Sequence, residues 1–218
     1  MFAPTKLVLP PRGALPKTSD EDPVDYYYRP LTAALYRGRL KLAARLLGSG
    51  PFEALLDVGY GSGIFLPELA RRAKRVVGLE AHTETAAVAQ GLRRLGVDAE
   101  LHTGDLFAMP FGDGAFDALV CLSVLEHLTR LDDALTEFRR VLRPGGVAVV
   151  CFPTRNPVTD GFFRLAGFDP RVLHPSGHLD ILAAARRHPR FAVEREAHFP
   201  ALLPLALSGY AGCRCRAV

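Results

Sequence analysis

From residue 54 onward, short runs of apolar residues alternate with longer segments in which apolar positions recur every three or four residues. Short apolar runs are typical of buried strands, and the longer period is typical of helices with one face on a core. The expected strands are Ala54–Val58, Arg75–Leu79, Ala99–Thr103, Ala118–Leu122, Val147–Phe152, Ala192–His198 and Leu205–Cys215. The expected helices are Ile64–Ala73, Thr83–Leu95, Leu131–Val141 and Leu179–His188. This alternation predicts an α/β fold with a mostly parallel sheet and helices on both faces.

The two ends of the chain depart from this alternation. The last two expected strands follow each other without a helix, which predicts one antiparallel hairpin at the sheet edge. Residues 1–22 are rich in proline and predict an extended arm, and a helical pattern follows over Leu31–Leu47. We therefore expect an N-terminal arm and lid helix over residues 1–50 and an α/β unit over 51–218, within a single domain overall.

Composition limits the protein class. The chain has 218 residues, 49% of them hydrophobic and 23% charged, as expected for one soluble globular domain. No apolar run reaches the ~18 residues of a membrane span, and Met1 to Lys17 lack the apolar centre of a signal peptide. We expect a cytoplasmic protein. The four cysteines lack metal-site spacing. Cys121 and Cys151 lie in apolar runs and are expected to be buried thiols, whereas Cys213 and Cys215 are expected on one face of a strand.

The net charge of +4 is spread over the chain without a dense basic run interleaved with aromatic residues. A basic arm and C-terminal third around an acidic centre could favour an anionic substrate, but a solvated surface is the simpler interpretation. No nucleic-acid partner is predicted. The sequence does not determine the oligomeric state.

The first predicted ligand-binding feature is a glycine-rich turn after the strand Ala54–Val58. Gly59, Gly61 and Gly63 stand at alternate positions just after Asp57. Glycine gives positive φ without steric cost and lets a ligand approach the backbone closely. Ligands of open α/β sheets bind beyond the carboxyl ends of the strands, where this turn would lie.

Two further carboxylates follow the next two expected strands. Glu80 lies 21 residues after Gly59, a position suited to accept hydrogen bonds from both hydroxyls of a ribose. The alternative is a strand-end carboxylate that faces water. Asp105 could accept a hydrogen bond from an exocyclic amine and Leu106 could cover a flat ring, whereas an Asx turn or helix cap is the alternative for Asp105.

Five segments in register resemble the class I S-adenosylmethionine-dependent methyltransferases, and most closely the small-molecule enzymes akin to those of ubiquinone and menaquinone biosynthesis. The segments are LDVGYGSG at 56–63, VVGLE at 76–80, GDLFAMPF at 104–111, FDALVCLSVLEHL at 116–128 and LRPGG at 142–146. The resemblance implies a Rossmann-like, doubly wound, seven-stranded, mostly parallel sheet with an antiparallel C-terminal strand. It also implies S-adenosyl-L-methionine as cofactor and S-adenosyl-L-homocysteine as product.

The same resemblance implies a set of cofactor-binding positions. Asp57 would support the turn, Glu80 would hold the ribose hydroxyls, and the backbone near Leu122 would line the methionine side. The full implied set is Asp57, Gly59, Tyr60, Gly61, Gly63, Glu80, Ala81, Asp105, Leu106 and Leu122.

The glycine spacing argues against a nicotinamide-dependent dehydrogenase. The dinucleotide motif GxGxxG would require glycine at position 64, where Ile64 stands. The N/D-P-P-Y/F turn of nucleic-acid and protein-amide methyltransferases is also absent, because residues 121–124 read CLSV. A small-molecule acceptor is therefore preferred.

Methyl transfer from a sulfonium depends chiefly on proximity and orientation, and a base is needed only when the acceptor must lose a proton. Candidate bases are His127, His174 and His178, each of which could equally be structural. Some relatives bind a divalent metal through Glu, Glu and His at i, i+3 and i+4. Here Glu126 and His127 match while Ser123 occupies the first position, so no metal is predicted.

Acceptor specificity is expected in residues 20–47 and 153–189. Candidate substrate-binding residues are Tyr26, Tyr28, Phe162 and Phe163, although adjacent tyrosines cannot all face one way and the phenylalanines could be helix packing. The sequence thus predicts a methyltransferase acting on a small, apolar or aromatic acceptor at an O, N or C atom. The alternative is a non-catalytic protein of the same fold that senses the cofactor or serves as a scaffold.

Overall fold

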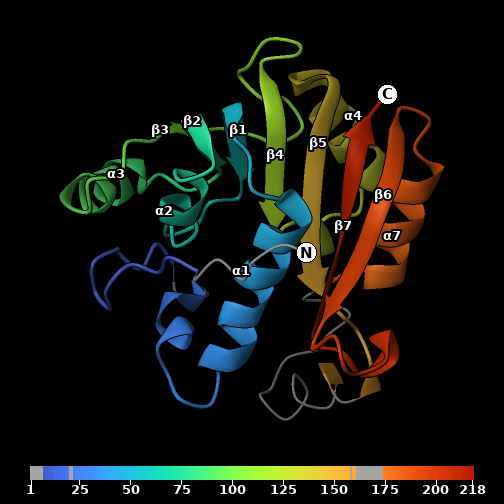
Figure 1. Ribbon diagram of the computed structural model, residues 1–218, viewed down its shortest axis with the longest axis horizontal. Coiled ribbons are helices and arrows are strands. Elements are labelled where there is room, and N and C mark those ends of the chain that lie inside the picture. Colours follow the sequence, from blue (N-terminus) through green and yellow to red (C-terminus); the bar gives the residue numbers. More distant parts are fainter. Residues whose placement is uncertain (1–6, 20–21, 158, 161–173) are drawn as a thin grey trace.

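The computed structural model describes residues 7–19, 22–157, 159–160 and 174–218, and within them it forms one seven-stranded sheet of order β3-β2-β1-β4-β5-β7-β6 (Figure 1). The strands β1 to β5 pair in parallel, whereas β7 is antiparallel to both β5 and β6. The strands are β1 Phe52–Val58, β2 Ala73–Glu80, β3 Glu100–Thr103, β4 Phe116–Leu122, β5 Leu142–Pro153, β6 Phe191–Phe199 and β7 Tyr210–Ala217. The predicted mixed sheet with a C-terminal hairpin at its edge is confirmed.

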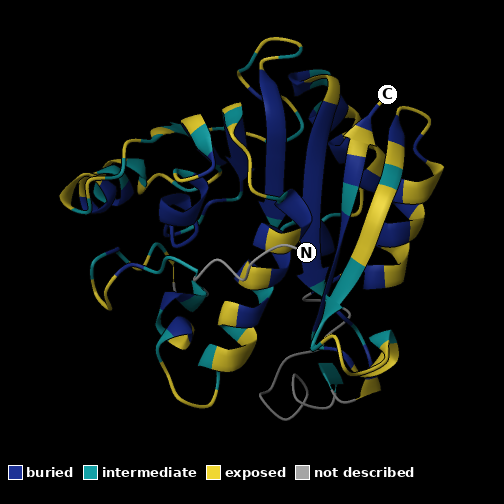
Figure 2. Ribbon diagram, in the orientation of Figure 1, coloured by how far each residue is buried: buried dark blue, intermediate teal, exposed yellow. Residues whose placement is uncertain are grey.

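Helices cover both faces of the sheet. One buried cluster joins α1 (Ala33–Leu47), α2 (Leu66–Leu69) and α3 (Thr85–Arg94) to one face, and the other joins α4 (Leu131–Val141) and α7 (His178–Arg187) to the opposite face. Alternation along β5 divides the two clusters, since Val149 belongs to the first and Val150 to the second. Figure 2 shows β4 and β5 buried along most of their length, while the outer sides of α1 and α7 are exposed.

Three elements differ from expectation by several residues, one of them β5, which begins at Leu142 instead of Val147. The helix expected over Ile64–Ala73 is the single turn α2, because Pro67 starts the helix late and β2 already begins at Ala73. The strand expected from Leu205 begins only at Tyr210, since Leu205–Leu207 form the short 3-10 helix η3 after Pro204. The four cysteines are all free and buried, as was expected for Cys121 and Cys151.

The N-terminal arm, residues 7–19, lies along the same layer as α2 and α3. The Val8 N–H donates to Glu68 Oε2 at 2.8 Å, and the Tyr28 hydroxyl donates to the Pro10 carbonyl at 2.6 Å. Leu15 is buried against α3, where a Cβ built at Gly91 would lie 3.0 Å from Leu15 Cδ2. The arm is thus attached to the strand–helix units near the carboxyl ends of the strands.

Helix α1 begins above the sheet ends, and its second half packs on the sheet. Leu40, Leu46 and Leu47 are buried in the same cluster as Val147 and Val149. The division into an arm with lid helix and an α/β unit stays a prediction. None of the helices that the structure describes is long and apolar enough to cross a membrane.

Candidate functional site

A cavity of about 840 Å³ lies at the carboxyl ends of β1, β2 and β4, between these strands, the arm and α1. A cavity of this size suits a ligand as large as a nucleoside derivative. Its lining comprises Thr18, Ser19, Asp22, Pro23, Tyr27, Arg39, Leu40, Asp57, Val58, Gly59, Tyr60, Gly61, Ser62, Ile64, Phe65, Leu79, Glu80, Ala81, His82, Thr103, Gly104, Asp105, Leu106, Phe107, Leu122, Ser123, Val124, His127 and Leu128. All the implied cofactor positions except Gly63 lie in this lining.

The three glycines of the turn have positive φ values, and their surroundings differ. A Cβ at Gly59 would lie 2.2 Å from a Val124 methyl, whereas Gly61 has no neighbour within 4 Å on that side. A Cβ at Gly63 would lie 2.9 Å from Val88 on α3. Gly63 therefore packs against α2 and α3 and does not line the cavity, so its expected contact with the cofactor stays a prediction.

Glu80 ties the end of β2 to the glycine turn. Its Oε2 accepts from the Gly61 N–H at 2.8 Å, and its Oε1 accepts from the Ala81 N–H at 2.8 Å. Each carboxylate oxygen has a second lone pair, and the residue lines the cavity. Glu80 can therefore hold the turn and accept two hydroxyl hydrogen bonds at the same time.

Asp57 lies at the floor of the cavity with 2% of its surface exposed. Burial, followed by the negative charge of Glu80, raises the pKa of Asp57 to about 8. Among the described residues no hydrogen bond joins the Asp57 carboxylate to the glycine turn. The predicted support of the turn by Asp57 is therefore not a direct hydrogen bond. A buried carboxyl in this position can receive a cation or donate as a neutral acid.

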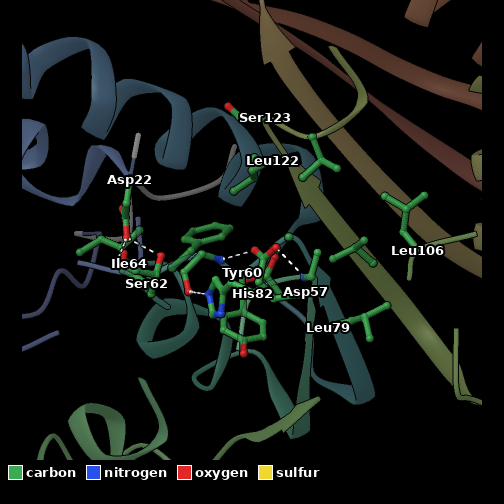
Figure 3. Close-up of a pocket in the computed structure, with 18 of the residues that line it drawn as sticks. Asp22, Asp57, Tyr60, Ser62, Ile64, Leu79, His82, Leu106, Leu122 and Ser123 are labelled. Atoms are coloured by element: carbon green, nitrogen blue, oxygen red, sulfur yellow. Dashed lines mark hydrogen bonds between the residues drawn. The ribbon is translucent and has the colours of Figure 1, made fainter. Parts of the chain in front are cut away.

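Tyr60 and His82 form the wall beside the turn (Figure 3). Their rings meet edge to face with centroids 5.3 Å apart, and the Tyr60 hydroxyl bonds Thr85 Oγ1 at 3.0 Å. His82 Nε2 lies 2.9 Å from the Gly61 carbonyl oxygen. The sequence analysis missed His82, although it stands two residues after Glu80.

Asp105 and Leu106 line the cavity after β3, as implied. Asp105 Oδ1 accepts from the Phe107 N–H at 2.9 Å, which is the Asx turn considered as the alternative. The side chain is exposed, and its other oxygen has no recorded bond among the described residues. Asp105 can therefore form the Asx turn and still accept a hydrogen bond from an exocyclic amine.

The end of β4 carries a polar cluster that the sequence analysis did not identify. Ser123 has φ of 57°, the one positive value at a described residue other than glycine, and such strain is concentrated at functional sites. Its hydroxyl accepts from Arg39 Nη1 at 3.0 Å and also bonds the Tyr210 hydroxyl. Arg39 further donates to the hydroxyl of Tyr27. Figure 3 shows Ser123 at the side of the cavity away from Tyr60 and His82.

Of the three candidate histidines, His127 alone lines the cavity. His174 is buried behind it, with the two ring centroids 5.1 Å apart. Burial lowers the pKa of His174 to about 4, with the charges of His127 and Arg155 as further causes. His178 begins α7, and its Nδ1 accepts from the Arg155 N–H at 3.1 Å; it does not line the cavity, and its role as base stays a prediction.

Glu126, His127 and His174 bring one carboxylate and two imidazoles within 4.8 Å of one another. Such a donor set can bind a divalent metal. However, Ser123 is engaged by Arg39, and the positive charge of Arg39 also acts on Glu126. Burial raises the pKa of Glu126 to about 8, and its Oε2 has no hydrogen-bond partner. The absence of a metal stays a prediction.

The tyrosine that lines the cavity is not one of the two expected, because the 3-10 helix η1 (Pro23–Tyr27) sets the direction of each side chain. Tyr26 packs on Tyr36 at the surface, and Tyr28 bonds Pro10, so neither lines the cavity. Tyr27, with 1% of its surface exposed, lines it instead. Phe162 and Phe163 lie outside the described residues.

Comparison with known proteins agrees with this site. Residues 56–150 match the methyltransferase domain family, and the matched segment contains the glycine turn, Glu80 and the end of β4. Residues 56–150 therefore carry a methyltransferase domain, and the chain is similar to S-adenosylmethionine-dependent methyltransferases. S-adenosylmethionine is the cofactor of this methyltransferase family, and the cavity offers the groups to hold it.

One curated relative is a demethylmenaquinone methyltransferase of Tropheryma whipplei (strain Twist), 33% identical over 128 residues, or 57% of this chain and 52% of the relative. A geranyl diphosphate C-methyltransferase from Streptomyces coelicolor has a similar structure, with TM-score 0.70 and 18% identity over 91% of this chain and 85% of that one. A (4+2)-cyclase is similar with TM-score 0.67 and 22% identity, covering 86% and 81% of the two chains. The chain spans about half the length of the curated relatives it matches.

Proposed function

We propose that the protein binds S-adenosylmethionine in the cavity and transfers its methyl group to a small acceptor. The observation that carries the proposal is Glu80, bonded to the Gly61 N–H and lining the cavity beyond the first two parallel strands. An acid in this position accepts hydrogen bonds from ribose hydroxyls. Asp105 and Leu106 then suit the base, and Gly59 and Leu122 suit the amino-acid part.

The cofactor supplies a methyl group on a sulfonium, which needs no protonation of the leaving thioether. The protein's own part is to orient the two reactants and to exclude water. Gly61 leaves the backbone open at the cavity, and the arm covers the side that the strands do not. His127, which lines the cavity near the end of β4, is the residue placed to remove an acceptor proton.

An apolar or aromatic acceptor is supported by part of the lining. Phe65, Phe107, Val124 and Leu128 present hydrocarbon to the cavity. Such surfaces favour a flat or aliphatic body, while the few polar groups determine its orientation. The acceptor atom, whether oxygen, nitrogen or carbon, is decided by which group meets the methyl donor.

A cofactor-binding protein without methyl transfer is the second candidate. It is favoured by the similarity to a cyclase, because a shared fold does not determine the reaction. Both candidates bind the cofactor, and only the first transfers the labelled methyl group to an acceptor.

The deciding experiment is calorimetric titration with S-adenosylhomocysteine, run beside NADH and NADPH. We expect micromolar binding of S-adenosylhomocysteine alone, followed by methyl transfer in an acceptor screen with radiolabelled donor. Binding of a nicotinamide cofactor instead would overturn the proposed function. Binding of S-adenosylhomocysteine with no labelled product from the screen would favour the second candidate.

A further inference from the structure

A second cavity, of about 320 Å³, lies between α4 and the turn that joins α7 to β6. It shares no lining residue with the larger cavity at the carboxyl ends of β1, β2 and β4. Its polar and charged lining comprises Asp132, Thr136, Arg139, Arg187, His188 and Arg190. Arg139 Nη1 donates to the carbonyl of Leu142, the first residue of β5, so this cavity lies near the amino ends of the parallel strands. Figure 1 shows α4 and the C-terminus at this end of the sheet, whereas the arrows of β4 and β5 point to the other end.

The lining of this second cavity brings three arginines and a histidine together against one carboxylate. That carboxylate, of Asp132, accepts from Arg187 Nη2 at 2.9 and 2.8 Å. Arg139 has 7% of its surface exposed, and its recorded bonds go to backbone carbonyl oxygens. The side chain of Arg190 has no hydrogen bond or ion pair with any described residue. The charges of Arg139 and Arg190 are therefore not balanced by an acid of the lining.

The positive charges of the lining act on one another. Burial, and then the positive charge of Arg190, lowers the pKa of Arg139. Burial also lowers the pKa of His188; the charge of Asp132 opposes this, and the charges of Arg190 and Arg139 add to it. Like charges held together in a partly buried place destabilise each other's charged form. An anion between them would remove that repulsion.

The cavity also offers N–H groups that the described residues leave without an acceptor. They include the guanidinium of Arg190 and the Nη1 of Arg187, whose recorded bonds use Nη2 alone. His188 Nδ1 accepts from the Arg190 backbone N–H at 3.4 Å, so a neutral ring carries its proton on Nε2, which lies 3.4 Å from Thr136 Oγ1. Guanidinium groups bind phosphate oxygens in pairs, and a phosphate group carries close to two negative charges at neutral pH. A dianion with several oxygens therefore matches the excess charge of the lining.

We propose that the cavity between α4 and the α7–β6 turn binds a small phosphate-bearing anion. Its volume of about 320 Å³ is at the small end for ligand cavities, which suits a phosphate group more than a large ligand. The phosphate has two sources, the free ion and the phosphate end of a larger molecule, and the choice of probe separates them. The proposal does not depend on the proposed function, because the two cavities have no residue in common.

The experiment compares the loss of an arginine of the lining with the loss of a neighbouring arginine outside it. Inorganic phosphate, glycerol 3-phosphate and the carboxylate dianion succinate are titrated calorimetrically into wild type, Arg190→Gln and Arg186→Gln. All titrations have the same ionic strength, because salt screens exposed charges. Both replaced side chains are exposed, and Arg186 pairs with Glu196 outside the cavity. Thermal melting verifies that each variant is folded and measures the stabilisation by each anion.

We expect both phosphates to bind wild type and to raise its melting temperature. Arg190→Gln should weaken phosphate binding by about tenfold or more, whereas Arg186→Gln should equal wild type within about twofold. Arg190→Lys should regain part of the lost affinity, because it restores the charge without the planar fork. Tighter binding of glycerol 3-phosphate than of inorganic phosphate would assign the site to the phosphate end of a larger molecule, and the reverse order would assign it to the free ion.

Three outcomes overturn the proposal. If folded wild type binds neither phosphate, the cavity is not a phosphate site. Equal weakening in Arg190→Gln and Arg186→Gln shows that the surface charge attracts anions without binding them in the cavity. Succinate bound as tightly as the phosphates shows that the lining does not select phosphate. Failure of the proposed function is a separate result, because it is measured with S-adenosylhomocysteine at the other end of the sheet.

Discussion

The Glu80 carboxylate carries the most specific expectation at the scale of single residues. Glu80→Ala removes the acceptor of the Gly61 N–H and the group assigned to the ribose. We expect the affinity for S-adenosylhomocysteine to fall more than tenfold, measured by calorimetry. Glu84→Ala, an exposed acid four residues later, is the matched control and should bind as wild type. If Glu80→Ala bound S-adenosylhomocysteine as tightly as wild type, Glu80 would not be the residue that binds the ribose.

The carboxyl of Asp57 makes the stability of the folded protein depend on pH. Its pKa is raised from the ordinary 3.8 to about 8 by burial and by the facing charge of Glu80, and Tyr60 and Cys121 are its other titratable neighbours. The folded state then binds the proton more tightly than the unfolded state. Stability is therefore full below the ordinary pKa and falls as pH rises toward the raised one, by about 1.4 kcal/mol per pH unit.

Asp57→Asn should abolish this dependence. We expect equal unfolding free energies for variant and wild type near pH 4, and a variant that is more stable by several kcal/mol near pH 8, from urea denaturation at each pH. Asp98→Asn, an exposed acid, serves as the control. Parallel curves for Asp57→Asn and wild type would show that the carboxyl is not protonated in the folded state.

His127 is tested through the rate once an acceptor has been identified. If it removes the acceptor proton, His127→Gln should lower kcat by about a hundredfold or more while S-adenosylhomocysteine affinity is unchanged. His102→Gln, outside the cavity, should behave as wild type.

A chelator should leave the wild-type rate unchanged. The positive charge of Arg39, which is bonded to Ser123, opposes the binding of a metal cation beside Glu126. Loss of activity with EDTA, regained with a divalent metal, would contradict the prediction of no metal.

At the scale of elements, the glycine turn combines a binding role with a packing role. Gly63 has φ of 79°, and a Cβ there would lie 2.9 Å from Val88 on α3. Gly63→Ala should therefore lower the unfolding free energy by about 1–3 kcal/mol, measured by chemical denaturation. The folded protein should still bind S-adenosylhomocysteine. A large loss of affinity at unchanged stability would place Gly63 back in the cofactor site.

The elements that the sequence predicted well are those with a clear run of apolar residues. Residues 118–122 and 147–152 are apolar on both sides, as central parallel strands must be, and β4 and β5 contain them. The boundaries failed at Pro67 and Leu205, where a proline and an exposed apolar run changed the local conformation. The predicted cofactor positions that line the cavity lie at strand ends and turns, which local sequence determines, and their contact with the cofactor stays a prediction.

The residues that were missed depend on contacts between distant segments. Arg39 and Ser123 are 84 positions apart and meet only when α1 lies over β4. Nothing in the local pattern at either residue indicates that contact. Tyr27 could not be distinguished from its two tyrosine neighbours in the sequence, because only the 3-10 helix η1 determines which one faces inward. His174 likewise meets His127 only in the folded chain.

At the scale of the whole molecule, the cavity is completed by a part of the chain outside the α/β core. Thr18, Ser19 and Asp22 line it, yet their position depends on anchors further along the arm. Leu15 is one anchor, buried against α3 without itself lining the cavity. A change at Leu15 therefore acts on the ligand only through the position of the arm.

Leu15→Ala should weaken S-adenosylhomocysteine several-fold while the melting temperature without ligand changes little. The reason is that the arm can detach locally, at a free-energy cost below that of global unfolding, and such local opening reduces affinity by the fraction of molecules in which the arm is in place. Calorimetry and thermal melting measure the two effects separately. Leu179→Ala, at an exposed leucine of α7, is the control. If Leu15→Ala bound as wild type, the strand ends alone would form the site, whereas equal losses of affinity and global stability would mean that arm and core unfold as one unit.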